Sequence, residues 1–208
     1  MLSLVIGNKQ LSSWSLRPWL LLRHLDLPFR EIALTLDTPE FQPAIRAYTP
    51  AGRVPVLLDG DLRIWDSLAI IEYLHEKSGG QAWPADAAHR AHARSISAEM
   101  HSGFAALRER WPMQAASRNL NVPLSAEALV NVTRIDELWQ HCRTRHAAAG
   151  PWLFGTYSAA DAMYAPVVLR FNTYGAALSP LSAAYVQRTL DDRHVGEWIA
   201  AAHAETAV

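Results

Sequence analysis

The chain has 208 residues, of which 50% are hydrophobic and 19% are charged, and its formal net charge is −1. This balance excludes an intrinsically disordered protein, and the near-zero net charge gives no electrostatic basis for binding nucleic acid or an anionic membrane. The single cysteine, Cys142, excludes an internal disulfide, and because no apolar run approaches ~20 residues we expect a cytoplasmic protein without a membrane span.

The first part of the chain alternates between predicted strands and helices. An apolar run at 2–6 predicts a buried strand, and the pattern around 19–25 predicts a helix. Pro18 is best tolerated in the first turn of a helix, which places the predicted N-cap near Ser15. Two further serines, Ser12-Ser13, then fall in the loop at the carboxyl end of the strand, where ligand sites form in α/β folds.

The next segments complete a recognisable order of elements. Residues 29–34 predict a second strand, and 39–47 predict a short irregular helix. Segments 54–58 and 62–65 predict a hairpin around Asp59-Gly60, followed by a helix over 66–77. The order β-α-β-α-β-β-α is that of a thioredoxin-like domain, which we place at residues 1–79.

The rest of the chain, from about residue 88, predicts helices only. They are expected at 88–111, 125–147, 158–174, 182–190 and 194–205. Ser158-x-x-Asp161 is typical of a capping box that starts a helix, a structural role. Segment 112–123 predicts a loop that could border an active site. The predicted fold class is therefore an α/β N-terminal thioredoxin-like domain plus an all-α C-terminal domain at 88–208.

Two motifs indicate a peptide ligand. Pro55 cannot donate to a sheet ladder, and X-Pro is the linkage that most readily becomes cis, which would leave the backbone of Val54 free to pair with an extended peptide. Eleven residues later, Asp66-Ser67 predicts a helix start whose N–H groups and dipole can hold a carboxylate, while the acid can take an ammonium. A backbone edge, a carboxylate site and an ammonium site together suit a γ-glutamyl peptide, glutathione.

These motifs resemble those of the soluble glutathione transferases. The resemblance includes Ser12-Ser13-Trp14-Ser15-Leu16-Arg17, which is similar to the Ser-Ser-Cys-Ser-x-Arg motif of zeta-class enzymes, with Trp14 in place of the cysteine. It implies the glutathione transferase fold, a serine-type enzyme, glutathione as co-substrate without a metal, and a homodimer.

The resemblance assigns roles to several residues. One serine hydroxyl would stabilise the glutathione thiolate; the zeta motif favours Ser12, whereas counting back from Arg17 as in theta- and delta-like enzymes favours Ser13. Arg53 stands where related enzymes meet the glycyl carboxylate, and Arg17 is expected to hold the first helix against the second domain. The acceptor pocket is expected between the first loop and helix 88–111, and its predicted residues are Trp14, Phe104, Arg108 and Trp111.

Alternative functions stay open at this point. A maleylacetoacetate isomerase of the zeta class would use an arginine where this chain has Thr173, with Arg170 about one turn away, which weakens that interpretation. A glutathione-dependent peroxidase or a non-catalytic binding protein on the same fold are the other candidates. His89-x-x-His92 has the spacing of metal ligands but no matching third ligand, so no metal is predicted. The expected function is conjugation of glutathione to small hydrophobic electrophiles, as in detoxification.

Overall fold

The computed structural model describes residues 1–206 and begins with a four-stranded mixed sheet. Its strands are β1 (Leu2–Ile6), β2 (Phe29–Ala33), β3 (Val56–Asp59) and β4 (Leu62–Trp65), in the order β2-β1-β3-β4. β1 and β2 are parallel, whereas β3 is antiparallel to both β1 and β4. The predicted hairpin around Asp59-Gly60 is confirmed, and Gly60 supplies the positive φ that its turn requires.

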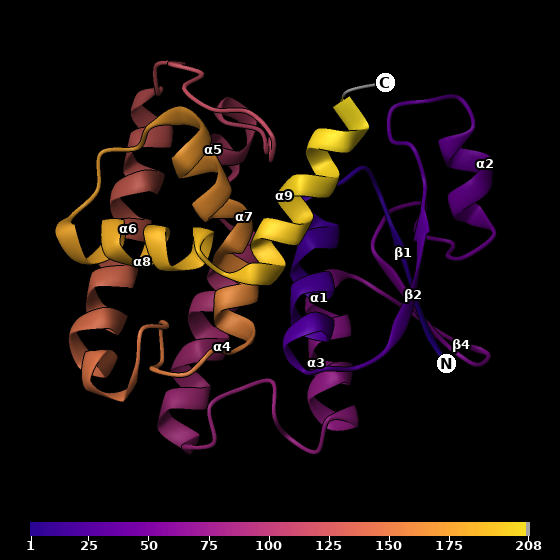
Figure 1. Ribbon diagram of the computed structural model, residues 1–208, viewed down its shortest axis with the longest axis horizontal. Coiled ribbons are helices and arrows are strands. Elements are labelled where there is room, and N and C mark those ends of the chain that lie inside the picture. Colours follow the sequence, from indigo (N-terminus) through magenta and orange to yellow (C-terminus); the bar gives the residue numbers. More distant parts are fainter. Residues whose placement is uncertain (207–208) are drawn as a thin grey trace.

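Three helices accompany the sheet. They are α1 (Ser13–His24), α2 (Phe41–Arg46) and α3 (Ser67–Lys77). Figure 1 shows α1 and α3 on the sheet face toward the remaining helices, with α2 on the opposite side. The order β-α-β-α-β-β-α predicted from the sequence is confirmed.

The second part of the molecule is helical. Its α-helices are α4 (Ala87–Ser102), α5 (Ala105–Arg110), α6 (Ala126–His146), α7 (Ala159–Tyr174), α8 (Pro180–Leu190) and α9 (Arg193–Thr206), with one 3₁₀ turn, η1 (Ala147–Ala149). The capping box at the start of α7 is confirmed. Among residues 1–206, no helix combines the length and apolar content needed to cross a bilayer.

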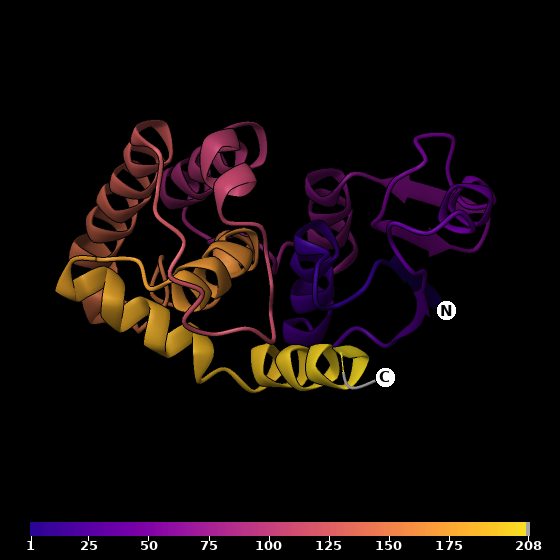
Figure 2. The same cartoon turned by 90° about the horizontal axis from the view of Figure 1, so that it is seen from above.

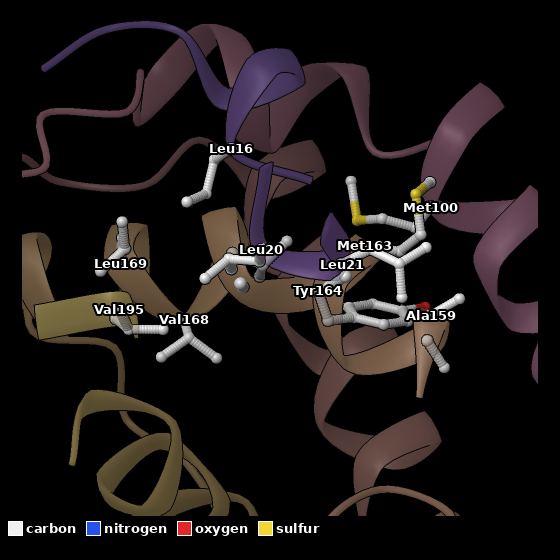
Figure 3. Close-up of a cluster of buried hydrophobic side chains, with 14 of the residues drawn as sticks. Leu16, Leu20, Leu21, Met100, Ala159, Met163, Tyr164, Val168, Leu169 and Val195 are labelled. Carbon is white, nitrogen blue, oxygen red and sulfur yellow. The ribbon is translucent and has the colours of Figure 1, made fainter. Parts of the chain in front are cut away.

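One continuous hydrophobic core joins the two parts. α7 is almost entirely buried and lies against α1, α4 and α8. In Figure 3, Leu16, Leu20 and Leu21 of α1 face α7, whose Met163 and Val168 are also buried. The apolar side of α1 therefore contributes to the core of the helical part as well as to that of the sheet.

The last helix returns to the start of the chain. α9 packs along α1 and reaches the loop between β1 and α1 (Figure 2). Trp198 Nε1 donates to the carbonyl of Lys9 at 2.8 Å, and the Glu205 carboxylate accepts from the N–H groups of Lys9 and Gln10 at 2.9 and 3.1 Å. The loop that precedes the two serines is thus held from the opposite end of the sequence.

The start of α1 differs from the prediction. Ser12, not Ser15, is the N-cap: its Oγ accepts from Ser15 N at 3.4 Å and donates to Ser15 Oγ at 2.7 Å. Ser13 is therefore the first helical residue rather than a loop residue. Pro18 therefore lies inside the helix. The stabilisation of the helix start by the Ser12 cap offsets the loss of the one main-chain hydrogen bond that a proline cannot donate.

The single helix predicted over 88–111 is also wrong, because it is two helices. α4 ends at Ser102, and Phe104 has a left-handed backbone with φ of 57° before α5 begins. The intervening residue is Gly103, where a Cβ would lie 2.7 Å from the carbonyl oxygen of Glu99. The chain can bend here only because that position carries no side chain.

Candidate active site

A cavity of about 320 Å³ lies between the sheet part and the helical part. Its lining comes from the ends of four segments: the start of α1, the segment before β3, the β4–α3 junction, and α4 with α5. The lining residues are Trp14, Ala51, Arg53, Val54, Pro55, Trp65, Asp66, Ser67, His101 and Arg108. All five predicted glutathione-binding residues, at 53–55 and 66–67, thus meet at one cavity.

The start of α3 presents an incompletely bonded helix N-terminus to this cavity. Asp66, the N-cap, accepts from the N–H groups of Leu68 and Ala69 at 2.9 and 3.3 Å, and has a left-handed φ of 75°. Ser67 is 2% exposed, and its hydroxyl has no hydrogen-bond partner among the described residues. A buried hydroxyl without a partner costs free energy, so this position is suited to a ligand that accepts a hydrogen bond.

The segment before β3 supplies a backbone edge. The Val54–Pro55 bond is cis, as predicted. The ladders of β3 with β1 and β4 begin at Val56, so Val54 lies beyond the last paired residue of the sheet. Arg53 is exposed at the cavity wall. An extended ligand can pair with the backbone of Val54 while Arg53 reaches a terminal carboxylate.

The two candidate catalytic serines lie at the start of α1 and do not reach the cavity. Both are buried, and neither is among the residues that line the cavity. The Ser12 hydroxyl is engaged as the cap of α1, while the Ser13 carbonyl accepts from Arg17 Nη1 at 3.2 Å. Trp14, the next residue, is the one that reaches the cavity from α1.

Trp14 lies within a cluster of basic side chains. The guanidinium carbons of Arg17 and Arg108 are 4.1 and 5.3 Å from its ring centroid, and the His101 ring meets it edge-on at 5.3 Å. His101 Nε2 is also 3.0 Å from an Asp66 carboxylate oxygen, which joins α4 to the start of α3. Arg17 donates through Nε to the Met163 carbonyl of α7 at 3.1 Å, so its expected role between the two parts is confirmed.

The predicted acceptor residues divide into two groups. Trp14 and Arg108 line the cavity, whereas Phe104 and Trp111 are buried elsewhere. Trp111 stacks on Tyr174 with ring centroids 5.2 Å apart and donates to the Val122 carbonyl at 2.8 Å. The left-handed backbone at Phe104 and the end of α5 before Trp111 interrupt this face of the predicted helix. Segment 112–123, expected to border the active site, packs in part against α7: Tyr174 Oη donates to the Pro112 carbonyl at 3.0 Å, and Leu120 N donates to the Thr173 carbonyl at 3.0 Å.

The two α7 positions that bear on the isomerase alternative are also internal. Thr173 Oγ1 lies 3.1 Å from the carbonyl oxygens of both Gln114 and Ser117. Arg170 Nε donates to the Trp111 carbonyl at 2.8 Å, and neither α7 residue lines the cavity.

The sequence interpretation missed three lining residues of the site, Ala51, Trp65 and His101. His101 is on α4, one turn before the bend, and Trp65 is the last residue of β4. The position of His101 between Trp14 and Asp66 depends on how α4 packs against the start of α3. The local signal for Trp65 was its place directly before Asp66-Ser67.

The histidines at 89 and 92 lie at a second cavity, of about 540 Å³, together with His141 and His146. Burial lowers the pKa of His92 and His146. Across residues 1–206, no three His, Cys, Asp or Glu side chains are grouped as ligands of a metal ion.

Comparison with known proteins identifies the N-terminal part of the chain. Residues 11–77 match the family model of the glutathione S-transferase N-terminal domain. A dichloromethane dehalogenase of Methylorubrum extorquens is 40% identical over 58 residues, 27% of this chain and 20% of that protein. The chain thus spans about a fifth of the length of the first curated relatives it matches.

Longer similarities support the same assignment. Maleylacetoacetate isomerase of Rattus norvegicus is 28% identical over 172 residues, 81% of this chain and 77% of that protein. A glutathione transferase homologue from Burkholderia, solved with bound glutathione, superposes over 98% of both chains with a TM-score of 0.73 and 22% identity. By sequence, residues 11–77 are therefore similar to the glutathione S-transferase N-terminal domain, and the chain as a whole has the fold of the glutathione transferases.

Proposed function

We propose that the protein is a glutathione transferase that joins the sulfur of glutathione to an electrophilic carbon of a small acceptor. The observation that carries the proposal is the unpartnered, buried hydroxyl of Ser67 at the helix N-terminus that faces the cavity. A carboxylate at this helix start would accept from Ser67 and lie at the positive end of the α3 dipole. The neighbouring Asp66 would meet the ammonium of the same γ-glutamyl group.

The other contacts follow from the same cavity. The backbone of Val54 would pair with the cysteinyl part of the tripeptide, and Arg53 would bind its glycyl carboxylate. Residues 1–79 would thus form the glutathione-binding domain, and residues 88–208 would complete the acceptor side through α4 and α5. Bound glutathione would supply the sulfur nucleophile, so the reaction needs no metal.

We further propose that a serine near the start of α1 lowers the thiol pKa. A free thiol has a pKa near 8.5, and each unit of lowering corresponds to about 1.4 kcal/mol of thiolate stabilisation. Ser12 was favoured by the motif, but its hydroxyl already caps α1 and donates to Ser15 Oγ. Because Ser13 is not the helix cap, we now expect its hydroxyl to be the donor.

For an aryl chloride acceptor, the chemistry is a substitution. The thiol proton is released to solvent, the thiolate sulfur forms a bond to the ring carbon that carries chlorine, and that C–Cl bond breaks with loss of chloride. The protein contributes by orienting the two reactants and by stabilising the thiolate before attack.

The test compares Ser12→Ala, Ser13→Ala and the double variant. Each is assayed for conjugation of an aryl halide, for glutathione affinity by calorimetry, and for the pKa of the bound thiol by its ultraviolet absorbance. We expect Ser13→Ala to retain affinity, to raise the thiol pKa by about one unit and to slow conjugation about tenfold near neutral pH. An unchanged thiol pKa in all three variants would rule out a serine donor.

The similarity to glutathione transferases also leads us to propose a cytoplasmic homodimer with a role in detoxification. Leu62 of β4, which is 48% exposed, is an apolar side chain that a second subunit could cover. Rat maleylacetoacetate isomerase is among the relatives, and a cis–trans isomerase remains the second candidate function. Turnover of a cis-enedione with little activity on aryl halides would favour it.

A further inference from the structure

Arg108 is a charged side chain at the cavity without a carboxylate partner. It lies on α5, is half-buried, and lines the cavity opposite the glutathione-binding segments. Its recorded polar contact is a long one, from Nη1 to the carbonyl oxygen of His101 at 3.4 Å. Within residues 1–206 it forms no ion pair, and burial lowers its pKa. A partly desolvated guanidinium is stabilised when an anion binds it.

Two buried arginines near Arg108, Arg17 and Arg170, add to the positive potential at this wall of the cavity. Arg17 is fully buried, and its Nη2 has no hydrogen-bond partner in the described part of the chain. Arg170 is 4% exposed and donates only to the carbonyls of Trp111 and Pro166. The charge of Arg108 further lowers the pKa of both, after the larger effect of burial. The three guanidinium groups are therefore close enough to affect one another's pKa, and Asp66 is the carboxylate whose charge acts in the opposite direction, on Arg17.

The one carboxylate that lines the cavity is already engaged. Asp66 accepts from two N–H groups of α3 and contacts His101 at 3.0 Å. In the proposed binding mode, Ser67 and Arg53 hold the two carboxylates of glutathione at the opposite wall. Neither carboxylate is therefore assigned to Arg108, which stands on the wall given by the helical part.

We propose that Arg108 binds an anionic group, such as a carboxylate, of the acceptor, and that the enzyme selects anionic electrophiles over neutral ones. The inference rests on the proposed function and specifies the substrate class of that site. The Trp14 and Trp65 indoles, which line the same cavity, provide apolar surfaces for an aromatic or unsaturated acceptor body. The substitution is the one described above; Arg108 takes no part in bond making and orients the acceptor.

The test uses a chloronitrobenzoate and the corresponding chloronitrobenzamide, which differ in charge but share the leaving group and the activating nitro group. The kcat/KM of each is divided by its uncatalysed rate constant with glutathione. We expect the wild type to prefer the benzoate by about ten- to a hundredfold. Arg108→Gln should remove this preference by lowering the benzoate value alone, and Arg108→Lys should restore part of it. The matched control is Arg110→Gln, an exposed α5 arginine that binds the Pro123 carbonyl.

A second measurement separates this proposal from the proposed function. The glutathione conjugates of the two acceptors are prepared chemically, and their binding is followed by calorimetry, which needs no turnover. Tighter binding of the carboxylate conjugate, lost in Arg108→Gln, supports the anion site even if neither acceptor is turned over. Equal loss for both acceptors and both conjugates, together with a raised thiol pKa, would show that Arg108 acts on the thiolate and would overturn the proposal. So would a wild type without charge preference.

Discussion

The starts of α3 and α7 use the same two residue types, a serine and an aspartate, with opposite results. At α7 the Asp161 carboxylate is 1% exposed and accepts from the N–H groups of Leu153 and Ser158 at 3.0 and 2.9 Å. It also accepts from the Ser158 and Tyr185 hydroxyls at 3.2 and 3.1 Å. At α3 the Ser67 hydroxyl has no partner within the described residues, and Asp66 is exposed with a left-handed backbone.

This difference shows how one local motif serves structure or binding. Where every donor and acceptor is matched internally, as around Asp161, the polar group fixes a helix in the core. Where a donor is left unmatched beside a cavity, as at Ser67, the fold retains an unsatisfied group that a ligand can satisfy. A non-glycine residue with a left-handed φ costs on the order of 1–3 kcal/mol, and such residues cluster at ligand sites.

The largest effect on stability is expected from removing the Asp161 carboxylate at the start of α7, where all the hydrogen-bonding groups are paired. Asp161→Ala would leave the buried donors of Leu153, Ser158 and Tyr185 without an acceptor, and we expect a loss of about 3–5 kcal/mol in the free energy of unfolding. Urea unfolding followed by circular dichroism measures it. Asp191→Ala, at the exposed end of α8, is the control and should change stability by less than about 0.5 kcal/mol. A loss below about 1 kcal/mol in Asp161→Ala would contradict the structural role.

The pH dependence of folding stability gives a second test of the role of Asp161 at the start of α7. Burial raises the pKa of Asp161 from 3.8 to about 6, against the effect of its hydrogen bonds. The pKa of Asp161 is thus higher in the folded protein than in the unfolded chain, so the protonated carboxyl group favours the folded state. This contribution to stability is complete below about pH 3.8 and is lost as the pH rises through about 6. Relative to Asp161→Asn, which does not titrate, the wild type should lose about 2–3 kcal/mol of unfolding free energy across this range. An opposite slope would mean that the hydrogen bonds outweigh burial.

Removing the unmatched hydroxyl should affect binding without harming the fold. Ser67→Ala deletes a buried group that has no partner, so stability should stay constant or rise by up to about 1 kcal/mol. The dissociation constant for glutathione should rise about ten- to a hundredfold, because a charge-assisted hydrogen bond is lost. Calorimetry and urea unfolding measure the two effects, with Ser95→Ala on the exposed face of α4 as the control. A stability loss with unchanged affinity would place Ser67 in the same class as Ser158.

The smallest effect concerns the thiol of Cys142, which is buried in the helical core near Asp161. Cys142 is fully buried, and burial, with the nearby Asp161 charge, raises its pKa to about 12. We expect native protein to resist a thiol-specific reagent at neutral pH and to react once unfolded. Fast labelling of the folded protein would show that this part of the core opens readily.

The sequence predicted the α/β part well because its signals are local. Alternation, the Asp59-Gly60 turn, Val54-Pro55 and the Asp66-Ser67 helix start each lie within a few residues, and the structure brings the last two to one cavity. The first helix was the exception. Pro18 suggested a late start, but the capping contact of Ser12 with Ser15 depends on which of three nearby serines the loop places at the helix end.

The acceptor side could not be predicted to the same degree because it depends on tertiary packing. The chain bends at Gly103–Phe104 and α5 ends before Trp111, so Trp111 packs against Tyr174 of α7, although the spacing of three and four places it on the same predicted helical face as Arg108. Only Gly103 marked the bend, and a lone glycine in a helical pattern is usually tolerated. His101 meets Asp66 across the two parts of the molecule, a contact for which no local pattern exists.

The attachment of α9 to the first loop has a consequence for how the protein is made. Trp198 and Glu205 hold the backbone of Lys9 and Gln10, just before Ser12 and Ser13. The ribosome synthesises these two anchors after all four strands, so the nascent chain can form its sheet while this loop still lacks its final support. The candidate site is therefore expected to reach its final form only after α9 has been made, and chains that stop before α9 should keep the sheet but not the position of the serines.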